Sequence, residues 1–127
     1  PDYYLGMLRA QALRSVRVII DIGMHLELSI PRDQRFHPGE KWTPKLGLEF
    51  IRERSHFPPD FVASEIDRYL GTPGQAISYK VGERVWLEAR EDAKRLGPAF
   101  DLKAWHNRAL RIGPMGLGQM KREMAKP

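Results

Sequence analysis

Apolar side chains recur every three or four positions over residues 3–28, which is the period of an amphipathic helix. The stretch VRVII within it could form a strand, but the flanking period and the length favour a helix. Residues 29–42, SIPRDQRFHPGEKW, follow as a loop of a length that is often functional or mobile. The expected apolar stripe of the helix consists of Leu5, Leu8, Ala12, Val16, Ile19, Ile20, Gly23 and Leu26.

Prolines and glycines divide the next part of the chain into two helices. Thr43 and Pro44 suit the N-cap and the first helical position, which predicts a helix over residues 44–55. A third helix is expected over residues 59–70, and Gly71 is expected to end it in the left-handed conformation. The expected buried side chains of these two helices are Leu46, Phe50, Ile51, Val62, Ile66, Tyr69 and Leu70.

The remaining residues continue this pattern. A second Thr-Pro pair at Thr72 predicts a long helix over residues 73–96, and Asp101 is expected to cap a fifth helix that Gly113 ends. Apolar side chains recur at helical spacing over residues 117–124, but glycines in this part of the chain make a helix there weak. The helically spaced apolar residues of this last segment are Leu117, Met120 and Met124. The expected inward side chains of the two helices before it are Ile77 or Ser78, Val81, Val85, Ala89, Leu96, Leu102, Trp105, Ala109 and Leu110. With no convincing period of two, the sequence predicts an all-α fold, a multi-helix bundle with two long helices and several short ones.

Length and charge restrict the classes of protein that this chain can belong to. Its 127 residues suit a single helical domain over 1–127, and the initial Pro indicates that the chain is a piece of a longer protein. No run of 18 apolar residues exists, so we expect no membrane partner. The net charge of +5 could attract nucleic acid, but acids alternate with the basic residues, so we expect solvated helix faces instead. The absence of Cys leaves the compartment open.

Asp21 and His25 are four positions apart on the first predicted helix, so their side chains share one face. A carboxylate that orients an imidazole is common in acid–base catalysis, whereas the alternative is an ordinary surface pair. Gly23 lies between them at a cost of about 1 kcal/mol relative to Ala in a helix. Such a glycine predicts a close approach by another helix or by a ligand.

Arg17 precedes Asp21 by one turn and forms a second pair at this spacing. One interpretation is a salt bridge within the helix, which would stabilise it by about 0.2–0.5 kcal/mol. The other is a guanidinium group that binds an anionic group such as a carboxylate.

The segment PGQAISYKVG contains donors at the predicted start of a helix. Backbone N–H groups at a helix start can bind an anion, and Gln75 would lie in the first turn, with Tyr79 on the same face. The phenol of Tyr79 and the ammonium of Lys80 could stabilise a developing oxyanion. The alternative is a buried Tyr, a Lys that extends to solvent, and a close helix crossing at Gly82.

The four histidines do not form a zinc-binding pattern. No two of them are at i and i+4, and no HExxH sequence is present. We therefore expect no autonomous metal site in this chain.

The order of these motifs resembles the C-terminal portion of a bacterial family of large helical proteins of unknown function that look like zinc metallopeptidases. The resemblance covers nearly all of the chain. It rests on LRSVRVIIDIGMH, WTPKLGLEFIRERS, VASEIDRYLGTPGQAISYKVGE and FDLKAWHNRALRIGPMGL, with DxGxH and PGQAxSYKxG as the specific elements. Family members often have Thr where Ile22 stands, and the loop over residues 29–41 looks longer here.

The resemblance implies that zinc and its HExxH helix lie upstream, in the N-terminal part of the parent protein, which this chain would contact. It implies that Tyr79 donates to the oxyanion, that Asp21 orients His25, and that Arg17, Gln75 and Lys80 bind a peptide substrate. The chain alone would then be inactive. The alternative is a non-catalytic helical binding module that uses the loop over residues 29–42 and the basic faces. In either case a homo-oligomer is possible, because a long helix without its partners exposes its apolar stripe.

Overall fold

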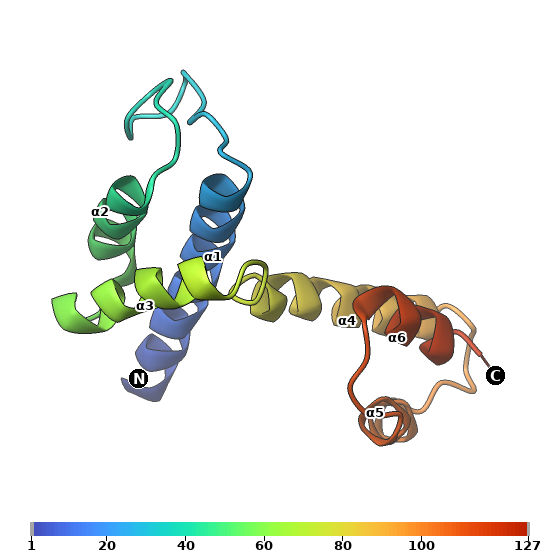
Figure 1. Ribbon diagram of the computed structural model, residues 1–127. Coiled ribbons are helices and arrows are strands. Elements are labelled where there is room, and N and C mark those ends of the chain that lie inside the picture. Colours follow the sequence, from blue (N-terminus) through green and yellow to red (C-terminus); the bar gives the residue numbers. More distant parts are fainter. Residues whose placement is uncertain (1, 127) are drawn as a thin grey trace. The chain divides into compact units, whose positions relative to one another are not determined.

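A computed structural model of the chain, which describes residues 2–126, contains helices and no strand within those residues (Figure 1). The helices are α1 (Asp2–His25), α2 (Pro44–Ser55), α3 (Pro59–Gly71), α4 (Ser78–Lys94), α5 (Leu102–Arg111) and α6 (Leu117–Met124). The predicted all-α fold is confirmed, and α1 and α4 are its two long helices.

The chain divides into two compact units, one up to Lys80 and one from Val81 onwards. Each unit has its own hydrophobic core. The single domain expected from the chain length stays a prediction.

Two helix starts follow directly from the capping residues. The Thr43 hydroxyl accepts a hydrogen bond from the Leu46 N–H at 3.2 Å, and the Asp101 carboxylate accepts one from the Ala104 N–H at 2.8 Å. Each side chain satisfies a backbone donor that has no partner within its helix. Both predicted caps are therefore confirmed.

The predicted junction between α3 and α4 is wrong. Helix α3 includes Gly71, and the positive φ of +78° belongs to Gly74. Residues 72–77 form turns, in which Gln75 N–H donates to the Thr72 carbonyl at 3.2 Å. Because a left-handed residue interrupts the helical path at Gly74, α4 begins at Ser78 and not at the Thr-Pro pair.

The core of the first unit lies between α1, α2, α3 and the segment that connects α1 to α2 (Figure 1). The buried apolar side chains of α1 begin only at Leu13. The main members of this core are Leu13, Val16, Ile20, Met24, Ile30, Phe36, Trp42, Leu46, Phe50, Ile51, Val62, Ile66 and Tyr69.

Several apolar side chains that were expected inside are exposed, namely Leu5, Leu8, Ile19, Leu26, Leu70, Leu96, Leu102 and Leu110. On α1 the period is correct, but the buried face is that of Leu13, Val16, Ile20 and Met24. A helical period is compatible with several neighbouring faces, and the helix that packs against it selects one of them.

Gly23 is in close contact with Trp42, which explains a glycine in the middle of α1. A Cβ atom at Gly23 would lie 2.6 Å from two ring atoms of Trp42. The close approach predicted from the sequence therefore exists, but the group that approaches is an indole ring from the connecting segment. Gly47 of α2 has a similar function, since a Cβ there would lie 3.1 Å from Ile20 and Met24.

The segment over residues 26–43 is tied to itself and to the core. The Ile30 N–H donates to the Glu40 carbonyl at 2.8 Å, and the Trp42 N–H donates to the Leu28 carbonyl at 2.9 Å. Phe36 stacks on Trp42, with ring centroids 5.7 Å apart. The aromatic side chains of this long connection therefore complete the core of the first unit.

His37 of this segment lies between two carboxylates. Its Nδ1 is 3.0 Å from Glu40 Oε1, and its Nε2 is 2.8 Å from Glu49 Oε1. Two acceptors require a proton on both ring nitrogens, so the hydrogen bond with Glu49, followed by that with Glu40, raises the pKa of His37 above its ordinary value.

We expect the contribution of His37 to stability to depend on pH. Because its pKa is higher in the folded state, the contribution is complete below about pH 6.5 and is lost as the pH rises through the raised pKa. The urea midpoints of the wild type and His37→Gln should therefore differ most at acidic pH and converge at alkaline pH. In a Glu40→Gln/Glu49→Gln background the same substitution should have no pH-dependent effect. A difference that stays constant across pH would contradict this prediction.

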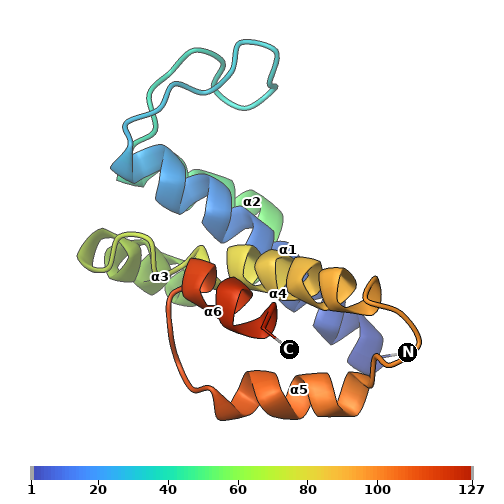
Figure 2. The same cartoon turned by 90° about the vertical axis from the view of Figure 1, so that its right-hand side faces the viewer.

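The second unit has a small core built from α4, α5 and α6 (Figure 2). Its buried side chains are Ala89, Trp105, Ala109, Met120 and Met124, and Trp86 packs edge-on against Trp105 at 5.2 Å. Among the described residues a Cβ at Gly82 would meet only Leu117, at 3.9 Å, so the close helix crossing of the alternative interpretation is not found there. None of the described helices is long and apolar enough to cross a membrane.

Candidate functional site

The two specific sequence elements meet within the first unit, where residues 73–80 run antiparallel along α1. The Gly74 N–H donates to Asp21 Oδ1 at 3.2 Å, near the C-terminal end of α1. At the other end of the segment, Lys80 Nζ donates to Gln11 Oε1 at 3.0 Å. Residues that are more than fifty positions apart in sequence therefore form one continuous surface.

Asp21 and His25 form the predicted pair. His25 Nδ1 lies 2.8 Å from Asp21 Oδ1 and 2.9 Å from the Asp21 carbonyl oxygen. Asp21 is 1% exposed, and Gly74 supplies a second donor to the same Oδ1. The carboxylate therefore fixes the orientation of the imidazole, as an orienting carboxylate does in acid–base sites. Its catalytic role stays a prediction.

One oxygen and one nitrogen of this pair have no hydrogen-bond partner among the described residues. They are Asp21 Oδ2 and His25 Nε2, and both atoms are buried. The two residues, though not these closed-off atoms, are among those that line a pocket of ≈ 280 Å³ with mostly apolar walls. The pocket is lined by Asp21, Ile22, His25, Leu26, Pro73, Gly74 and Ile77.

One of the backbone N–H groups that were expected to bind an anion near the start of α4 binds a carboxylate of the protein itself. The Gly74 N–H points to the carboxylate of Asp21 and lies in the turn before α4, four residues ahead of the helix. The prediction of free N–H groups at a helix start is therefore wrong for Gly74, because the turn places this donor against α1.

Arg17 binds α3 instead of Asp21. Its Nη2 lies 2.5 Å from Glu65 Oε2, and its Nε lies 3.1 Å from the same oxygen and 2.9 Å from the Tyr69 hydroxyl. The Tyr69 hydroxyl donates to Glu65 Oε2 at 2.6 Å. The salt bridge within α1, one of the two interpretations of Arg17, is not found among the described residues, because the guanidinium group is directed across to α3.

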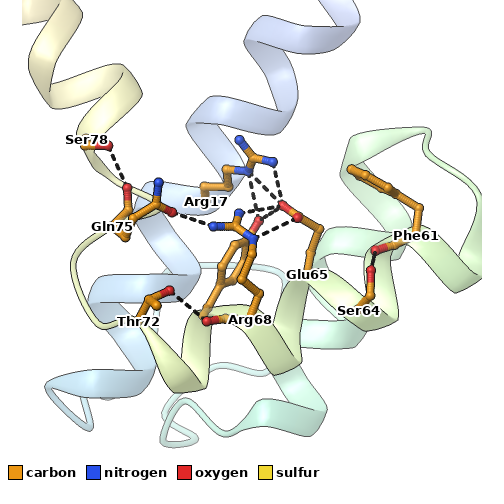
Figure 3. Close-up of polar contacts among 9 residues, drawn as sticks. Arg17, Phe61, Ser64, Glu65, Arg68, Thr72, Gln75 and Ser78 are labelled. Carbon is orange, nitrogen blue, oxygen red and sulfur yellow. Dashed lines mark hydrogen bonds and ion pairs between the residues drawn. The ribbon is translucent and has the colours of Figure 1, made fainter.

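Glu65 also holds Arg68, and Arg68 in turn holds Gln75 (Figure 3). Arg68 donates to both carboxylate oxygens of Glu65 at 3.1 Å, and its Nη1 donates to Gln75 Oε1. Sequence reasoning placed Gln75 in the site but missed Glu65 and Arg68. The available signal was the spacing of Glu65, Arg68 and Tyr69, which puts three polar groups on one side of α3.

The titration of this cluster follows from burial and hydrogen bonds. Burial alone raises the pKa of the Glu65 carboxyl, but hydrogen bonds from Arg68, Tyr69 and Arg17 outweigh it and hold that pKa below its ordinary value. Burial, then the hydrogen bond to Glu65, raises the pKa of the Tyr69 phenol well above its ordinary value. At neutral pH two guanidinium groups therefore face one carboxylate, and the cluster keeps a positive charge.

Tyr79 lies against this positive cluster and is half exposed. Its ring centroid is 5.3 Å from the Arg17 guanidinium carbon and 5.8 Å from that of Arg14. The side chain of Tyr79 is 46% exposed, so it is not the buried tyrosine of the alternative interpretation. Arg14 is a further basic residue of this surface.

This geometry can be compared with known protein families. Residues 1–124 match the family described as "Bacterial protein of unknown function (DUF885)". The chain belongs to this family. No curated relative matches the sequence. Membership agrees with the bacterial family of unknown function that the motifs resemble, and it leaves the peptidase activity as a proposal.

The arrangement of potential ligand side chains bears on metal binding by this part of the family protein. Among residues 2–126, no three His, Cys, Asp or Glu side chains come together as a ligand set. His25 and His37 are each held by carboxylates of the chain itself. The expectation that this chain has no metal site of its own stays a prediction.

Proposed function

We propose that this chain forms the C-terminal, substrate-binding part of a cleft in a zinc-dependent peptidase. The proposal places the zinc ligands outside this chain, on the HExxH helix implied by the family resemblance, so that the chain alone is inactive. The observation that carries it is the Asp21–His25 pair, in which Asp21 is buried and held by Gly74 and both residues line a pocket.

Within this proposal His25 transfers or accepts a proton at Nε2. Donation of Nδ1–H to Asp21 selects the tautomer and orients the ring. Asp21 acts through His25 and is a positioning residue.

Tyr79 supplies the second proposed function, which is donation of its phenol O–H to a developing oxyanion. Its exposed side chain and the two guanidinium groups under its ring support this role, because they make the surrounding surface positive. Lys80, Gln75 and Arg17 line the same surface and are proposed to bind a substrate carboxylate. Since Glu65 already neutralises part of the charge of Arg17, the contribution of Arg17 is mainly to the local field.

A non-catalytic helical binding module is the second candidate. The observation that favours it is the N-terminal half of α1, which exposes the large apolar side chains Tyr3, Tyr4, Leu5, Met7 and Leu8. The loop over residues 29–42 is a weaker candidate for such a surface, because its aromatic side chains are buried.

The test is peptide hydrolysis by the full-length family protein that contains this chain. We expect Tyr79→Phe and His25→Gln each to lower kcat/KM by a factor on the order of 10². Tyr3→Phe is the matched control and should leave kcat/KM unchanged, because Tyr3 is exposed and lies at the other end of α1.

Each part of the proposal can fail separately. Unchanged kcat/KM in Tyr79→Phe would remove the oxyanion role of this residue, and unchanged kcat/KM in His25→Gln would remove proton transfer by the imidazole. A zinc-loaded full-length protein that hydrolyses no peptide would instead favour the binding module.

A further inference from the structure

The guanidinium group of Arg14 differs from its neighbours in the first unit because no acceptor of the described chain binds it. Arg17 and Arg68 both bind the carboxylate of Glu65 (Figure 3). Arg14 lies one turn before Arg17 on α1, and among residues 2–126 it has no hydrogen bond and no ion pair. Its printed contact is with the ring of Tyr79, whose centroid lies 5.8 Å from the guanidinium carbon. A cation–π contact of this kind satisfies none of the five N–H donors of an arginine.

Solvent reaches these donors. Arg14 is partly buried as a residue, but its nitrogen atoms do not belong to the buried atoms without a hydrogen bond in the described part of the chain. Tyr79, against which the guanidinium group lies, is 46% exposed. A ligand at this surface can therefore contact the donors of Arg14 directly.

The charges of this surface favour an anionic ligand. Arg17 and Arg68 share the one negative charge of Glu65, so these three side chains together keep a positive charge. Arg14 adds a further positive charge three positions from Arg17 on the same helix, where like charges repel each other. A bound anion relieves this repulsion, and a planar carboxylate can accept two parallel N–H bonds from one guanidinium group.

Arg14 is better placed for such a bond than Arg17. The side chain of Arg17 is only 12% exposed, and its Nε and Nη2 already donate to Glu65. A ligand carboxylate at Arg17 would have to compete with Glu65 for these donors. At Arg14 it would displace no acceptor of the described chain.

We propose that the guanidinium group of Arg14 binds a carboxylate of the ligand. On the proposed peptidase function, on which this second statement rests, the carboxylate belongs to the peptide, as its free carboxyl end or as an acidic side chain. Because Arg14 contacts the ring of Tyr79, the proposed oxyanion donor, this carboxylate lies close to the cleaved bond. Arg14 would then determine specificity for substrates that carry a negative charge near that bond.

Binding is tested by calorimetry on the full-length family protein, with two pairs of small probes in which an amide of the same shape replaces the carboxylate. N-acetylalanine and its amide represent the carboxyl end of a peptide, and the α-amides of N-acetylglutamate and N-acetylglutamine represent a side chain. We expect the acid of at least one pair to bind at least about tenfold more tightly than its amide, the usual ratio for a hydrogen bond to a charged group. The pair that shows the preference identifies the source of the carboxylate.

Arg14→Gln should abolish this preference for the acid. Arg14→Lys should keep part of it, because an ammonium group retains the charge but not the paired N–H donors. Arg52→Gln is the matched control and should leave the preference unchanged, because Arg52 is exposed on α2 and, like Arg14, has no ion pair among the described residues. The comparison of acid and amide on the wild type does not depend on how well a variant folds.

Equal binding of acid and amide in both pairs, or no binding of any probe, would overturn the proposal. A preference that survives Arg14→Gln would also overturn it and would leave Arg17 as the residue that binds the carboxylate. Inorganic phosphate that binds more tightly than both acids would overturn the choice of a carboxylate.

An activity measurement separates this inference from the proposed function. Hydrolysis of acidic peptides and of their amidated counterparts at equal kcat/KM removes the inference and keeps the peptidase. Binding of the acid that depends on Arg14, without hydrolysis of any peptide, keeps the carboxylate site and removes the peptidase.

Discussion

Replacement of Glu65 by Ala is expected to destabilise the first unit by about 3–5 kcal/mol, because it removes one partner of a buried ion pair. The side chains of Arg17 and Glu65 are only 12% and 9% exposed. Without the carboxylate, the Arg17 guanidinium group and the Tyr69 hydroxyl lose the acceptor that they share. Urea unfolding, monitored by hydrogen exchange of the amides of α2 and α3, measures the change in stability of this unit.

Glu53→Ala is the matched control for this prediction. Glu53 is bound to its neighbour Arg54, and both side chains are well exposed, so its loss should change stability by about 0–1 kcal/mol. Equal effects of the two substitutions would show that the Glu65 cluster has no special stabilising role.

Acid should reduce the effect of the Glu65 substitution. The pKa of this carboxyl is lower in the folded than in the unfolded state, so its contribution is complete above the unfolded value, near pH 4.3, and is lost as the pH falls through the folded value. The difference in stability between wild type and Glu65→Ala should therefore shrink in strongly acidic solution.

Replacement of Gly23 by Ala should destabilise the first unit by up to about 2 kcal/mol, because helix propensity offsets part of an overpacking cost of about 1–3 kcal/mol. The added methyl group would lie 2.6 Å from the Trp42 ring, which is held on its other sides by Phe36 and Phe50. Either the indole or the α1 backbone must then move. This cost exceeds the gain of about 1 kcal/mol that Ala normally brings to a helix.

Gly6→Ala on the same helix is the control. Nothing lies within 4 Å of a Cβ at Gly6, so this substitution should stabilise the unit by about 0.5–1 kcal/mol through helix propensity alone. If Gly23→Ala stabilises the protein by the same amount, the packing of Trp42 against α1 is not as close as the structure has it. Thermal or urea unfolding of the two variants measures their changes in stability, which we expect to have opposite signs.

The site was predictable from the sequence only where its contacts are local. Asp21 and His25 are four residues apart on one helix, so their pairing follows from helical geometry. The partner of Arg17 is 48 residues away, and the Gly74 donor is 53 residues from Asp21. No spacing rule reaches across such distances, and for this reason the helix salt bridge expected between Arg17 and Asp21 is replaced by one to Glu65.

The sequence by itself determined the all-α class, the capped starts of α2 and α5 and the pairing of Asp21 with His25. All of these depend on hydrogen bonds or side-chain spacings within one or two helical turns. Only the tertiary structure decided which face of α1 is buried, that Trp42 is the group packed against Gly23, and that Gly74 turns its N–H to Asp21. These features arise from packing between distant segments, where apolar burial and a shared carboxylate select one arrangement among several that the local pattern allows.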